Sequence, residues 1–433
     1  MRTIAELARR FVVYAMTERA KAVMRRYSPK ILVVTGGVGK TLTKDAIYTA
    51  LSPRFFVRRS EKNYNADIGV PLTILGVPNG RSDPVRWVRN YFESLFLTVM
   101  LVPYPRWLVL EVGADRPGDI TKALSWLEPD IVVATRFPAM PTHVEFYESP
   151  KAVIAEELAP AAWLPAAGAF IANADDEAAG AAPAAPEVKR MTYGFSSGAT
   201  VKGNRFHLLS KGGMPAGISF DVVSGEKRAH IMLPGVLGRQ HAYPILAGVA
   251  TALAAGIGLS KAAEAFSGYR SPPGRMRIIE GMRGSAVIDD SYNASPAATE
   301  EALGTLAAAP RKGKRIAILA DMLELGTFSV EAHEHAGEIA ARSCDMLITA
   351  GIRARGIAAG AKKAGMTEEK IIECDRPADA AAQAVALVGE GDIVLVKGSL
   401  AMRMERVVKA LMANPSKAKE LLVRQEREWF LRQ

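Results

Sequence analysis

The stretch ILVVTGGVGKTLTKD, residues 31–45, decides the fold of the first half of the chain. In it an apolar, β-branched run ends in a glycine-rich turn, and Lys40 and Thr41 follow the last glycine. Such a run is typical of a buried parallel strand, and a helix is expected to begin after the turn. Backbone N–H groups of such a turn can surround phosphate oxygens, a lysine adds positive charge, and a threonine hydroxyl can bind Mg²⁺. The stretch therefore predicts a nucleotide site.

The spacing of this motif differs from the common GxxxxGK[ST] pattern, because Val34 stands where the first glycine is expected. It fits a shorter TGxxGKT form. An incidental strand–turn–helix is the alternative, but the strand context together with the Lys-Thr pair disfavours it. The residues predicted to bind the nucleotide here are Thr35, Gly36, Gly37, Val38, Gly39, Lys40 and Thr41.

Composition indicates a globular protein of two or three domains, because 433 residues exceed one ordinary core and 49% of them are hydrophobic. The two cysteines, Cys344 and Cys374, form no CxxC pair. This excludes a disulfide framework and a zinc ribbon, and a reducing cytoplasm fits best. The net charge of +10 is spread along the chain without an RNA-binding signature. We therefore expect no nucleic-acid partner and attribute the charge to solubility and anionic substrates.

Residues 1–30 have the pattern of a basic amphipathic helix. Their apolar stretch, residues 11–16, is too short for a signal peptide or a spanning helix, so export is not indicated. Two interpretations stay open: a helix docked on its own domain, which we prefer, and a helix that contacts an anionic bilayer peripherally. The basic side chains that interleave with apolar ones are Arg2, Arg9, Arg10, Arg19, Lys21, Arg25 and Arg26.

The rest of the chain shows two successive α/β patterns. Strands and helices alternate from residue 31 to about residue 270, which predicts a mostly parallel sheet with helices on both faces. Polar strands in residues 206–223 predict a small β-excursion. The sequence Pro272-Pro273-Gly274 marks a domain break. The predicted fold class is α/β: a P-loop-type central ATPase domain at residues 31–273, followed by a Rossmann-like α/β domain at residues 274–433.

Several blocks recur together in an order that resembles the Mur ligases, the ATP-dependent amide ligases of peptidoglycan precursor synthesis. The blocks NYNADIGVP, DDSYNASP and DMLELG favour the members that join D-alanyl-D-alanine to a muramyl tripeptide. The blocks are TGGVGKTLTKD, NYNADIGVPLTIL (63–75), LEVGADRPGDI (110–120), PTHVEFYESP (141–150), NADDE (173–177), PPGRMRIIE (272–280), IDDSYNASP (288–296), LADMLELG (319–326) and VKGSLAMRME (396–405).

The resemblance implies a reaction in which negative charge accumulates, because a carboxylate becomes an acyl phosphate that an amine then attacks. Lys40 and Mg²⁺ would neutralise the phosphates, with Thr41 and Glu111 as ligands of the metal. It assigns His143 to a second Mg²⁺, although a lone histidine is usually structural. Asn63 and Asn65 resemble the loop that orients the acceptor end of the substrate, and turn chemistry is their alternative role.

The resemblance also assigns roles in the second domain. One of the two aspartates that end a strand, Asp289 and Asp290, would bind the ATP ribose, although strand-end capping is the alternative. Arg275 would contact the ATP phosphates as a catalytic residue. The residues expected near the nucleotide or the incoming dipeptide in this domain are Arg275, Asp289, Asp290, Tyr292, Asn293, Lys397 and Ser399.

The chain departs from the family pattern at three places. The family's carbamoylated lysine, which helps to hold the second Mg²⁺, aligns with Glu157, so that this glutamate either replaces it as a catalytic residue or leaves the metal to be held differently. Glu156 is adjacent, and Lys151 comes too early. The adenine-side pattern GRHNxxN appears as GRQHAYP, residues 238–244, which makes the adenine contacts uncertain in position. In NYNADIG, Ala66 replaces the usual asparagine.

The front of the chain departs most, because only one helix fits before Thr35. We expect the family's N-terminal UDP-binding domain to be absent, which leaves a UDP-linked or a lipid-linked donor open. The sequence thus predicts a cytoplasmic, monomeric ligase that uses ATP and Mg²⁺, with a muramyl peptide and D-alanyl-D-alanine as substrates. Its rivals are a Mur-like ligase for another carboxylate and a catalytically silent nucleotide-binding scaffold.

Overall fold

The computed structural model describes residues 2–60, 68–81, 83–141, 143–426 and 429, with the backbone alone at residues 2–5. Asn63, Asn65 and Ala66 lie outside the described residues. The chain divides into two compact units. The first comprises Met1–Asn204, Val222–Ala229 and Tyr243–Phe266, and the second comprises Arg205–Asp221, His230–Ala242 and Ser267–Gln433. The domain limits expected from the sequence stay a prediction.

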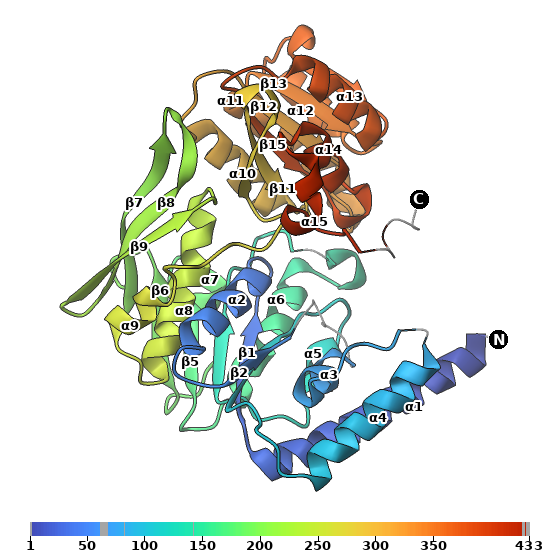
Figure 1. Ribbon diagram of the computed structural model, residues 1–433, viewed down its shortest axis with the longest axis vertical. Helices are drawn as coiled ribbons and strands as arrows, with labels where there is room; N and C mark the ends of the chain where they lie inside the picture. Colours follow the sequence, from blue (N-terminus) through green and yellow to red (C-terminus); the bar gives the residue numbers. More distant parts are fainter. Residues whose placement is uncertain (1, 61–67, 82, 142, 427–428, 430–433) are drawn as a thin grey trace. The chain divides into compact units, whose positions relative to one another are not determined.

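The larger sheet has nine strands among the described residues, in the order β2-β3-β1-β4-β5-β6-β7-β8-β9 (Figure 1). The six strands from β2 to β6 pair in parallel, which confirms the mostly parallel sheet. Strands β7 to β9 form the expected β-excursion. The strands are β1 (Lys30–Thr35), β2 (Val57–Arg59), β3 (Trp107–Glu111), β4 (Ile131–Ala134), β5 (Ala169–Asn173), β6 (Lys189–Gly194), β7 (Val201–Lys211), β8 (Met214–Ser224) and β9 (Lys227–Pro234).

Helices of this half begin at the signals that the sequence carries. The side chain of Asp83 caps α4, the side chain of Ser149 caps α6, and a proline follows each of them. The helices are α1 (Arg2–Tyr27), α2 (Lys40–Leu51), α3 (Gly69–Leu75), α4 (Pro84–Val99), α5 (Asp119–Leu124), α6 (Pro150–Leu158), α7 (Glu177–Gly180), α8 (Ala242–Ala254) and α9 (Leu259–Glu264), with 3₁₀ turns at Val144–Phe146 (η1), Ala159–Trp163 (η2) and Arg239–His241 (η3).

Strand β1 occupies the centre of the parallel part, between β3 and β4. Its residues 31–34 are at most 1% exposed, as expected for an apolar run covered on both faces. The register places Val34 opposite Glu111 on β3 and Thr35 opposite Ala134 on β4. Because the carboxyl ends of parallel strands meet at one edge, Thr35, Glu111 and the loop after β4 lie together there.

The smaller sheet has the order β10-β11-β15-β12-β13-β14, and only β10 runs antiparallel to its neighbour. Its strands are β10 (Arg277–Glu280), β11 (Ala286–Asp290), β12 (Arg315–Ala320), β13 (Met346–Ala350), β14 (Ile371–Cys374) and β15 (Ile393–Lys397). Its helices are α10 (Pro296–Ala308), α11 (Ser329–Ser343), α12 (Arg355–Lys363), α13 (Pro377–Leu387), α14 (Glu405–Leu411) and α15 (Ala418–Leu421).

Two hydrophobic cores cover the faces of this smaller sheet. Along β12, Ala317 and Leu319 belong to the core that includes α10, α11 and α12, whereas Ile316 and Ile318 belong to the core that includes α13 and α14. Successive side chains of a strand point to opposite faces, so helices pack on both sides. This arrangement confirms the Rossmann-like α/β expectation (Figure 1).

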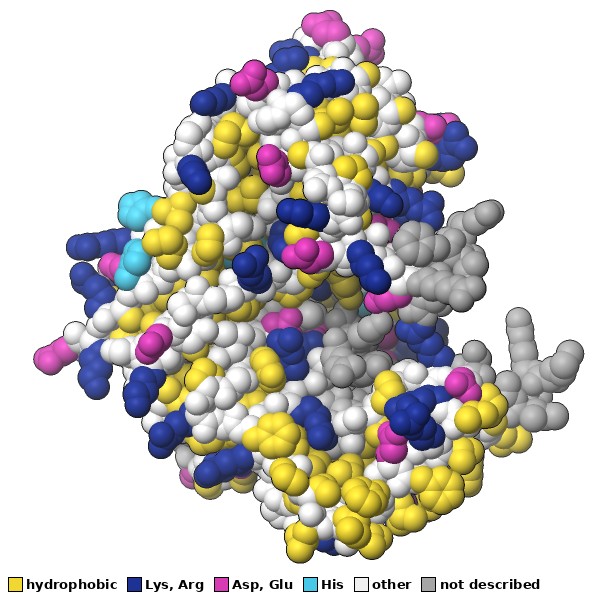
Figure 2. Space-filling model, in the orientation of Figure 1, with side chains coloured by type: hydrophobic (Ala, Val, Ile, Leu, Met, Phe, Trp, Pro, Cys, Tyr) yellow, Lys and Arg dark blue, Asp and Glu magenta, His cyan; other side chains and the backbone are white. Residues whose placement is uncertain are grey.

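The second half of α1 packs on its own unit, as we preferred for this helix. Met16, Ala20 and Val23 are at most 2% exposed and share the core of β1. Towards the start of α1, Phe11 and Tyr14 are exposed, and Figure 2 shows hydrophobic side chains gathered over α1 and α4. No helix among the described residues combines the length and the apolar character needed to cross a bilayer.

Candidate functional site

The turn between β1 and α2, residues 36–39, requires glycine at two places and is called the phosphate turn below. Gly36 has φ of +134°, and a Cβ built on it would lie 2.0 Å from Oγ1 of Thr135. Gly39 has φ of +87° immediately before α2. Backbone in this left-handed region favours glycine. The strand–turn–helix predicted from the sequence is therefore confirmed.

Backbone donors of the phosphate turn reach two different partners. The N–H groups of Gly37 and Val38 donate to the carbonyl oxygen of Arg136, at 2.9 and 3.0 Å, which ties the turn to the loop after β4. The N–H of Gly36 donates to Oε2 of Glu157 at 3.0 Å. The first N–H groups of α2 have no acceptor within their own helix, so its start adds partial positive charge beside Lys40. The region is suited to anionic oxygens.

The carboxylate of Glu157 is the central contact of this region. Glu157 lies on α6 and is 4% exposed. Its Oε2 accepts from the Thr35 hydroxyl at 2.6 Å, and its Oε1 lies 3.2 Å from Nζ of Lys40 and accepts from the N–H of Ala114 at 3.2 Å. Glu156 points elsewhere, because its Oε1 accepts from the N–H of Ile120. Of the two glutamates, Glu157 is the one at the phosphate turn.

Thr41 and Glu111 form the pair of oxygen atoms expected of a metal site. The hydroxyl of Thr41 donates to Oε1 of Glu111 at 2.8 Å. The other oxygen of Glu111 lies 3.1 Å from Nζ of Lys44, and both of these side chains are 2% exposed. Lys44 was missed in the sequence, although its place one helical turn after Lys40 could have indicated that it faces the same region.

This pair fits Mg²⁺ as the ion is usually bound beside nucleotides. The described residues contain no group of three or more His, Cys, Asp or Glu side chains that could hold a metal by themselves. Mg²⁺ is commonly held by one or two protein oxygens, with phosphate oxygens and water completing its shell. Two adjacent oxygens at the phosphate turn, from Thr41 and Glu111, meet that requirement.

His143, in the segment after β4, contacts Asp115 in the loop that follows β3. It precedes η1 with φ of +64°, and its Nε2 is 3.5 Å from Oδ1 of Asp115. Asp115 follows Ala114, whose N–H reaches Glu157. His143 and Glu157 therefore contact adjacent residues of one loop, as expected if both belong to one site.

The second unit places its predicted residues around the end of β11. Asp289 is fully buried, and its carboxylate accepts from the N–H of Gly274 at 3.0 Å and from the hydroxyl of Ser291 at 2.6 Å. Burial raises the pKa of Asp289 to about 6, against the stabilising effect of these donors. In this structure Asp289 holds Gly274 to the loop after β11, and its contact with a nucleotide stays a prediction.

Asp290 and Lys397 form a buried ion pair beside the aspartate described above. Nζ of Lys397 lies 2.6 Å from Oδ2 of Asp290 and donates to the carbonyl oxygen of Asn293 at 2.9 Å. The amide oxygen of Asn293 accepts from the N–H of Leu400 at 3.1 Å. The structure thus brings Asp290, Asn293 and Lys397 together, although the sequence placed the lysine at the dipeptide and the other two at the nucleotide.

Ser399 and Arg275 complete the predicted set. The hydroxyl of Ser399 is buried and accepts from the N–H of Leu323 at 2.9 Å. The guanidinium of Arg275 lies over the ring of Tyr292, with its carbon 4.1 Å from the ring centroid. Arg275 therefore flanks the loop that Asp289 organises, whereas Ser399 organises the loop after β12.

His241, from the altered adenine-side pattern, is a buried histidine in the second unit. Burial lowers its pKa to about 4. Its Nε2 has no hydrogen-bond partner among the residues that the structure describes. A buried nitrogen without a hydrogen-bond partner can bind a polar atom of a ligand. His241 is therefore a candidate contact for the nucleotide in the altered adenine-side pattern.

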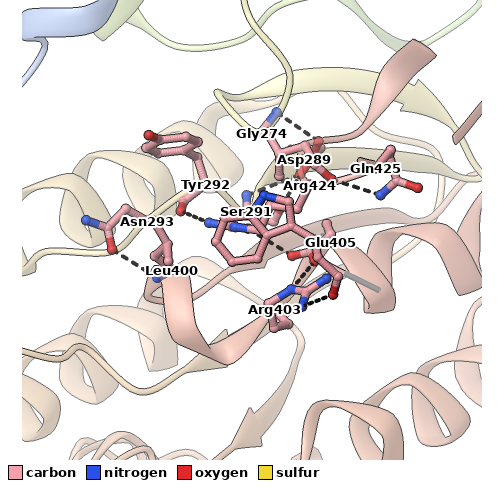
Figure 3. A network of polar contacts seen from close by, with 12 residues as sticks. Gly274, Asp289, Ser291, Tyr292, Asn293, Leu400, Arg403, Glu405, Arg424 and Gln425 are labelled. Carbon is pink, nitrogen blue, oxygen red and sulfur yellow. Dashed lines mark hydrogen bonds and ion pairs between the residues drawn. The ribbon is translucent and has the colours of Figure 1, made fainter. Parts of the chain in front are cut away.

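A network at the end of the chain supports the loop after β11 and was not predicted. Figure 3 shows Arg424 directed at this loop: Nη1 donates to the carbonyl oxygen of Ser291 at 3.2 Å, and Nη2 donates to that of Tyr292. Nη1 of Arg424 also lies 2.9 Å from Oε2 of Glu405, whose Oε1 pairs with Nε of Arg403 at 2.6 Å. Between α14 and Arg424 the described chain forms η8 (Pro415–Lys417) and α15, and the backbone then turns at Arg424, which has φ of +58°.

Comparisons with known proteins agree with this arrangement. The model for the Mur ligase middle domain matches residues 92–252, and the model for the Mur ligase, glutamate ligase domain matches residues 274–400. The chain is 26% identical over 410 residues to UDP-N-acetylmuramoyl-tripeptide–D-alanyl-D-alanine ligase of Bacillus subtilis, covering 93% of this chain and 80% of the relative. The enzyme of the same name from Escherichia coli is 26% identical over 413 residues, with coverage of 92% and 80%.

A solved structure supports the fold. The crystal structure of MurF ligase from Thermotoga maritima in complex with ADP superposes with a TM-score of 0.74 at 22% identity, covering 94% of this chain and 84% of that one. The two family models together match more than half of the sequence, in the order in which the two α/β patterns occur. The chain belongs to the Mur ligase family.

Proposed function

We propose that the protein is an ATP-dependent amide ligase of peptidoglycan precursor synthesis, which joins D-alanyl-D-alanine to the carboxylate of a muramyl tripeptide. The observation that carries this proposal is the phosphate turn, where Lys40, Glu157 and the Thr41–Glu111 pair surround a place suited to anionic oxygens. The relatives named for this reaction align over most of their own length, so the proposal concerns the whole reaction.

The proposed reaction has two steps. A carboxylate oxygen of the tripeptide attacks the γ-phosphorus of ATP, and ADP leaves, so an acyl phosphate forms. The amine of D-alanyl-D-alanine then attacks the acyl carbon and loses a proton, and inorganic phosphate leaves with one former carboxylate oxygen. Lys40 and the first N–H groups of α2 would stabilise the negative charge that develops on the transferred phosphoryl group.

Mg²⁺ would neutralise phosphate charge and orient the oxygens of ATP when bound. Thr41 and Glu111 are proposed to hold it, and His143 is proposed for a second Mg²⁺. Glu157 is proposed to replace the family's carbamoylated lysine as a carboxylate from the protein itself. Two contacts support this role. Glu157 accepts from the N–H of Gly36 in the phosphate turn and from the N–H of Ala114, the residue before Asp115, which His143 contacts.

The second unit is proposed to bind the nucleotide through Arg275, Asp290 and Asn293, with Asp289 fixing the loop that carries them. Lys397 and Ser399 are proposed to meet the dipeptide. The support is their clustering at the carboxyl ends of β11 and β15, where open α/β sheets usually bind ligands. The roles of Asn63 and Asn65 at the acceptor end stay predictions.

Two further features of the proposal concern the surroundings of the enzyme. We propose that it works in the cytoplasm as a monomer, with peripheral membrane contact through α1. A lipid-linked muramyl peptide is the second candidate donor, favoured by the exposed start of that basic helix. A catalytically silent scaffold is the remaining rival, motivated by Glu157 and the altered adenine-side pattern.

A direct assay separates these functions. Purified protein is mixed with ATP, Mg²⁺, D-alanyl-D-alanine and either a UDP-linked or a lipid-linked muramyl tripeptide, and products are identified by mass spectrometry. A ligase forms the pentapeptide and releases phosphate only when both the peptide and the amine are present. ATP binding without coupled phosphate release would identify a scaffold. The donor that is turned over decides between the UDP-linked and the lipid-linked forms.

A further inference from the structure

Helix α4 is inverted relative to an ordinary surface helix. Its only fully buried side chains among the described residues are polar: Asn90 and Ser94 are both 0% exposed. The side-chain amide of Asn90 donates to the carbonyl oxygen of Pro78 at 2.7 Å, and the hydroxyl of Ser94 donates to the backbone carbonyl oxygen of Tyr91 at 2.6 Å. The side of α4 that faces the protein thus combines these two hydrogen-bonded polar side chains with Trp87 and Leu97, which are partly buried and pack against the core of the first unit.

The apolar residues of α4 form a stripe on its solvent side. Their spacing of three or four residues places them on one face of the helix. Their exposure ranges from 53% for Phe96 to 75% for Val85, and such a stripe normally faces a protein core. The stripe residues are Val85, Val88, Phe92, Phe96 and Val99.

The stripe continues beyond α4. Leu101, just after the helix, is 89% exposed, and Leu7, Phe11 and Tyr14 of α1 are 62–70% exposed. A groove of about 660 Å³ runs between the two helices and is lined by Phe11, Trp87 and other side chains of both. Of seventeen exposed large hydrophobic side chains in the described part of the chain, eleven lie on α1, α4 or the two residues after α4. We call this surface the α1–α4 face.

The same two helices carry a strong excess of positive charge. They contain nine Arg or Lys residues and three glutamates. Arg9, Arg10, Arg25 and Arg26 are exposed. The end of α1 is joined to the end of α4 by hydrogen bonds: the guanidinium of Arg26 donates to the carbonyl oxygen of Thr98 at 2.5 Å, and the Tyr27 hydroxyl donates to the carbonyl oxygen of Met100 at 3.2 Å.

We propose that the α1–α4 face docks on the surface of an anionic phospholipid bilayer. Exposed aromatic and aliphatic side chains can enter the boundary between headgroups and acyl chains, while arginines beside them are attracted to anionic headgroups. This inference gives the peripheral contact proposed above a defined surface, in which α4 supplies most of the inserted side chains. It is independent of the ligase chemistry.

A second copy of the chain is the other occupant to consider, and charge disfavours it. A two-fold dimer through this face would place two surfaces of the same strong positive charge against each other. An anionic bilayer instead complements both the charge and the apolar stripe. The bilayer is therefore the occupant that the observations favour.

The test measures binding to vesicles without ATP, so its failure is distinguishable from failure of the proposed function. Full-length protein is sedimented with vesicles of phosphatidylcholine alone or mixed with phosphatidylglycerol. We expect salt-sensitive binding to the anionic vesicles. The variant Phe92→Ser/Phe96→Ser should bind about a hundredfold more weakly, about tenfold for each aromatic side chain removed from the lipid. The matched control Val330→Ser/Ile352→Ser removes two exposed apolar side chains of the other unit and should bind as the wild type does.

The remaining outcomes overturn or support the proposal. The variant Arg9→Gln/Arg10→Gln should weaken binding and flatten its salt dependence. A thermal unfolding curve of the Phe92→Ser/Phe96→Ser variant that matches the wild type, followed by circular dichroism, would show that it is folded, so that loss of vesicle binding supports the docking role. No binding to anionic vesicles, or equal loss in the control variant, would overturn the proposal. A lipid-free dimer that Phe92→Ser/Phe96→Ser converts to a monomer would identify a second copy as the occupant instead.

Discussion

The carboxylate of Glu157 lies 3.2 Å from the ammonium group of Lys40, and its other oxygen accepts from the phosphate turn. A buried anion thus stands where the resemblance expects phosphate oxygens to approach. Two anions cannot share such a site unless cations lie between or beside them. The proposed reaction would therefore need Lys40 and bound metal ions to offset both charges, which is the reason for proposing that Glu157 takes part in metal binding.

Replacing Lys40 tests whether it stabilises the transferred phosphoryl group. Lys40→Ala should lower kcat by about 10²–10³-fold, the range found when one charge-stabilising donor is removed. The fold should persist, because Lys40 is only partly buried and begins a helix. Steady-state kinetics and circular dichroism check both points, and full activity in Lys40→Ala would exclude the lysine from the mechanism.

Glu157→Gln separates charge from shape at the phosphate turn. The amide keeps one acceptor for Thr35 and Gly36 but removes the negative charge. If the carboxylate helps to hold metal, the Mg²⁺ concentration for half-maximal activity should rise about 10–100-fold. Glu156→Gln is the matched control, because Glu156 contacts Ile120 instead. An unchanged Mg²⁺ requirement in Glu157→Gln would assign the glutamate a purely structural role.

Glu111 has two roles that a double variant can separate. Glu111→Gln removes the carboxylate 3.1 Å from the buried Lys44 ammonium and leaves it Asp45 at 4.0 Å, which should lower the free energy of unfolding by about 3 kcal/mol. Adding Lys44→Met removes the stranded charge and should restore most of the stability. Activation by Mg²⁺ should stay impaired in both variants. Recovery of Mg²⁺ activation in the double variant would contradict a role of Glu111 in metal binding.

Asp289 and His241 should change the free energy of unfolding with pH in opposite directions. The pKa of Asp289 rises from 3.8 to about 6 on folding, so its contribution is full below pH 3.8 and is lost as pH rises through 6. The pKa of His241 falls from 6.5 to about 4, so its contribution is full above pH 6.5 and is lost as pH falls through 4. Each contribution is about 3 kcal/mol.

Single variants expose these two contributions. In Asp289→Asn the histidine remains, so the free energy of unfolding should fall as pH is lowered from 6.5 to 4. In His241→Gln the aspartate remains, so the free energy of unfolding should fall as pH is raised from 4 to 6. Urea unfolding at several pH values measures both slopes relative to the wild type. Parallel slopes in the two variants would refute the assignment.

Arg424 is expected to act as a positioning residue for the loop after β11. Arg424→Met should lower the free energy of unfolding by about 3 kcal/mol, because carbonyl oxygens of Ser291 and Tyr292 and the buried Glu405 lose a donor. The KM for ATP should rise more than kcat falls. Arg406→Met, an exposed arginine on α14, is the control. A stable variant with an unchanged KM would show that this network does not support the loop.

The phosphate turn could be predicted from sequence because its information is local. An apolar strand, glycines with special backbone and the Lys-Thr pair lie within fifteen residues, and the structure places them as expected. The mostly parallel character of the larger sheet also follows from the alternation of strands and helices. Glu157 was found only through the resemblance, since no local pattern connects it to a turn 121 residues away.

Contacts that depend on long-range packing were not predictable. Lys44 looks like an ordinary helix lysine until β3 places Glu111 beside it. Arg424 lies in the charged tail of the chain, and its contacts depend on a loop 133 residues earlier. The resemblance assigns one of Asp289 and Asp290 to the nucleotide, and this stays a prediction. The hydrogen bonds by which buried Asp289 also holds Gly274 and Ser291 could not be read from the sequence.

The most direct test of the central claim follows an oxygen atom. A muramyl tripeptide labelled with ¹⁸O in its terminal carboxylate is incubated with the protein, ATP, Mg²⁺ and D-alanyl-D-alanine, and the released phosphate is examined by mass spectrometry. Ligation through an acyl phosphate predicts a pentapeptide product and one ¹⁸O atom in each phosphate formed with it. Unlabelled phosphate, or ATP bound without any peptide product, would contradict the account.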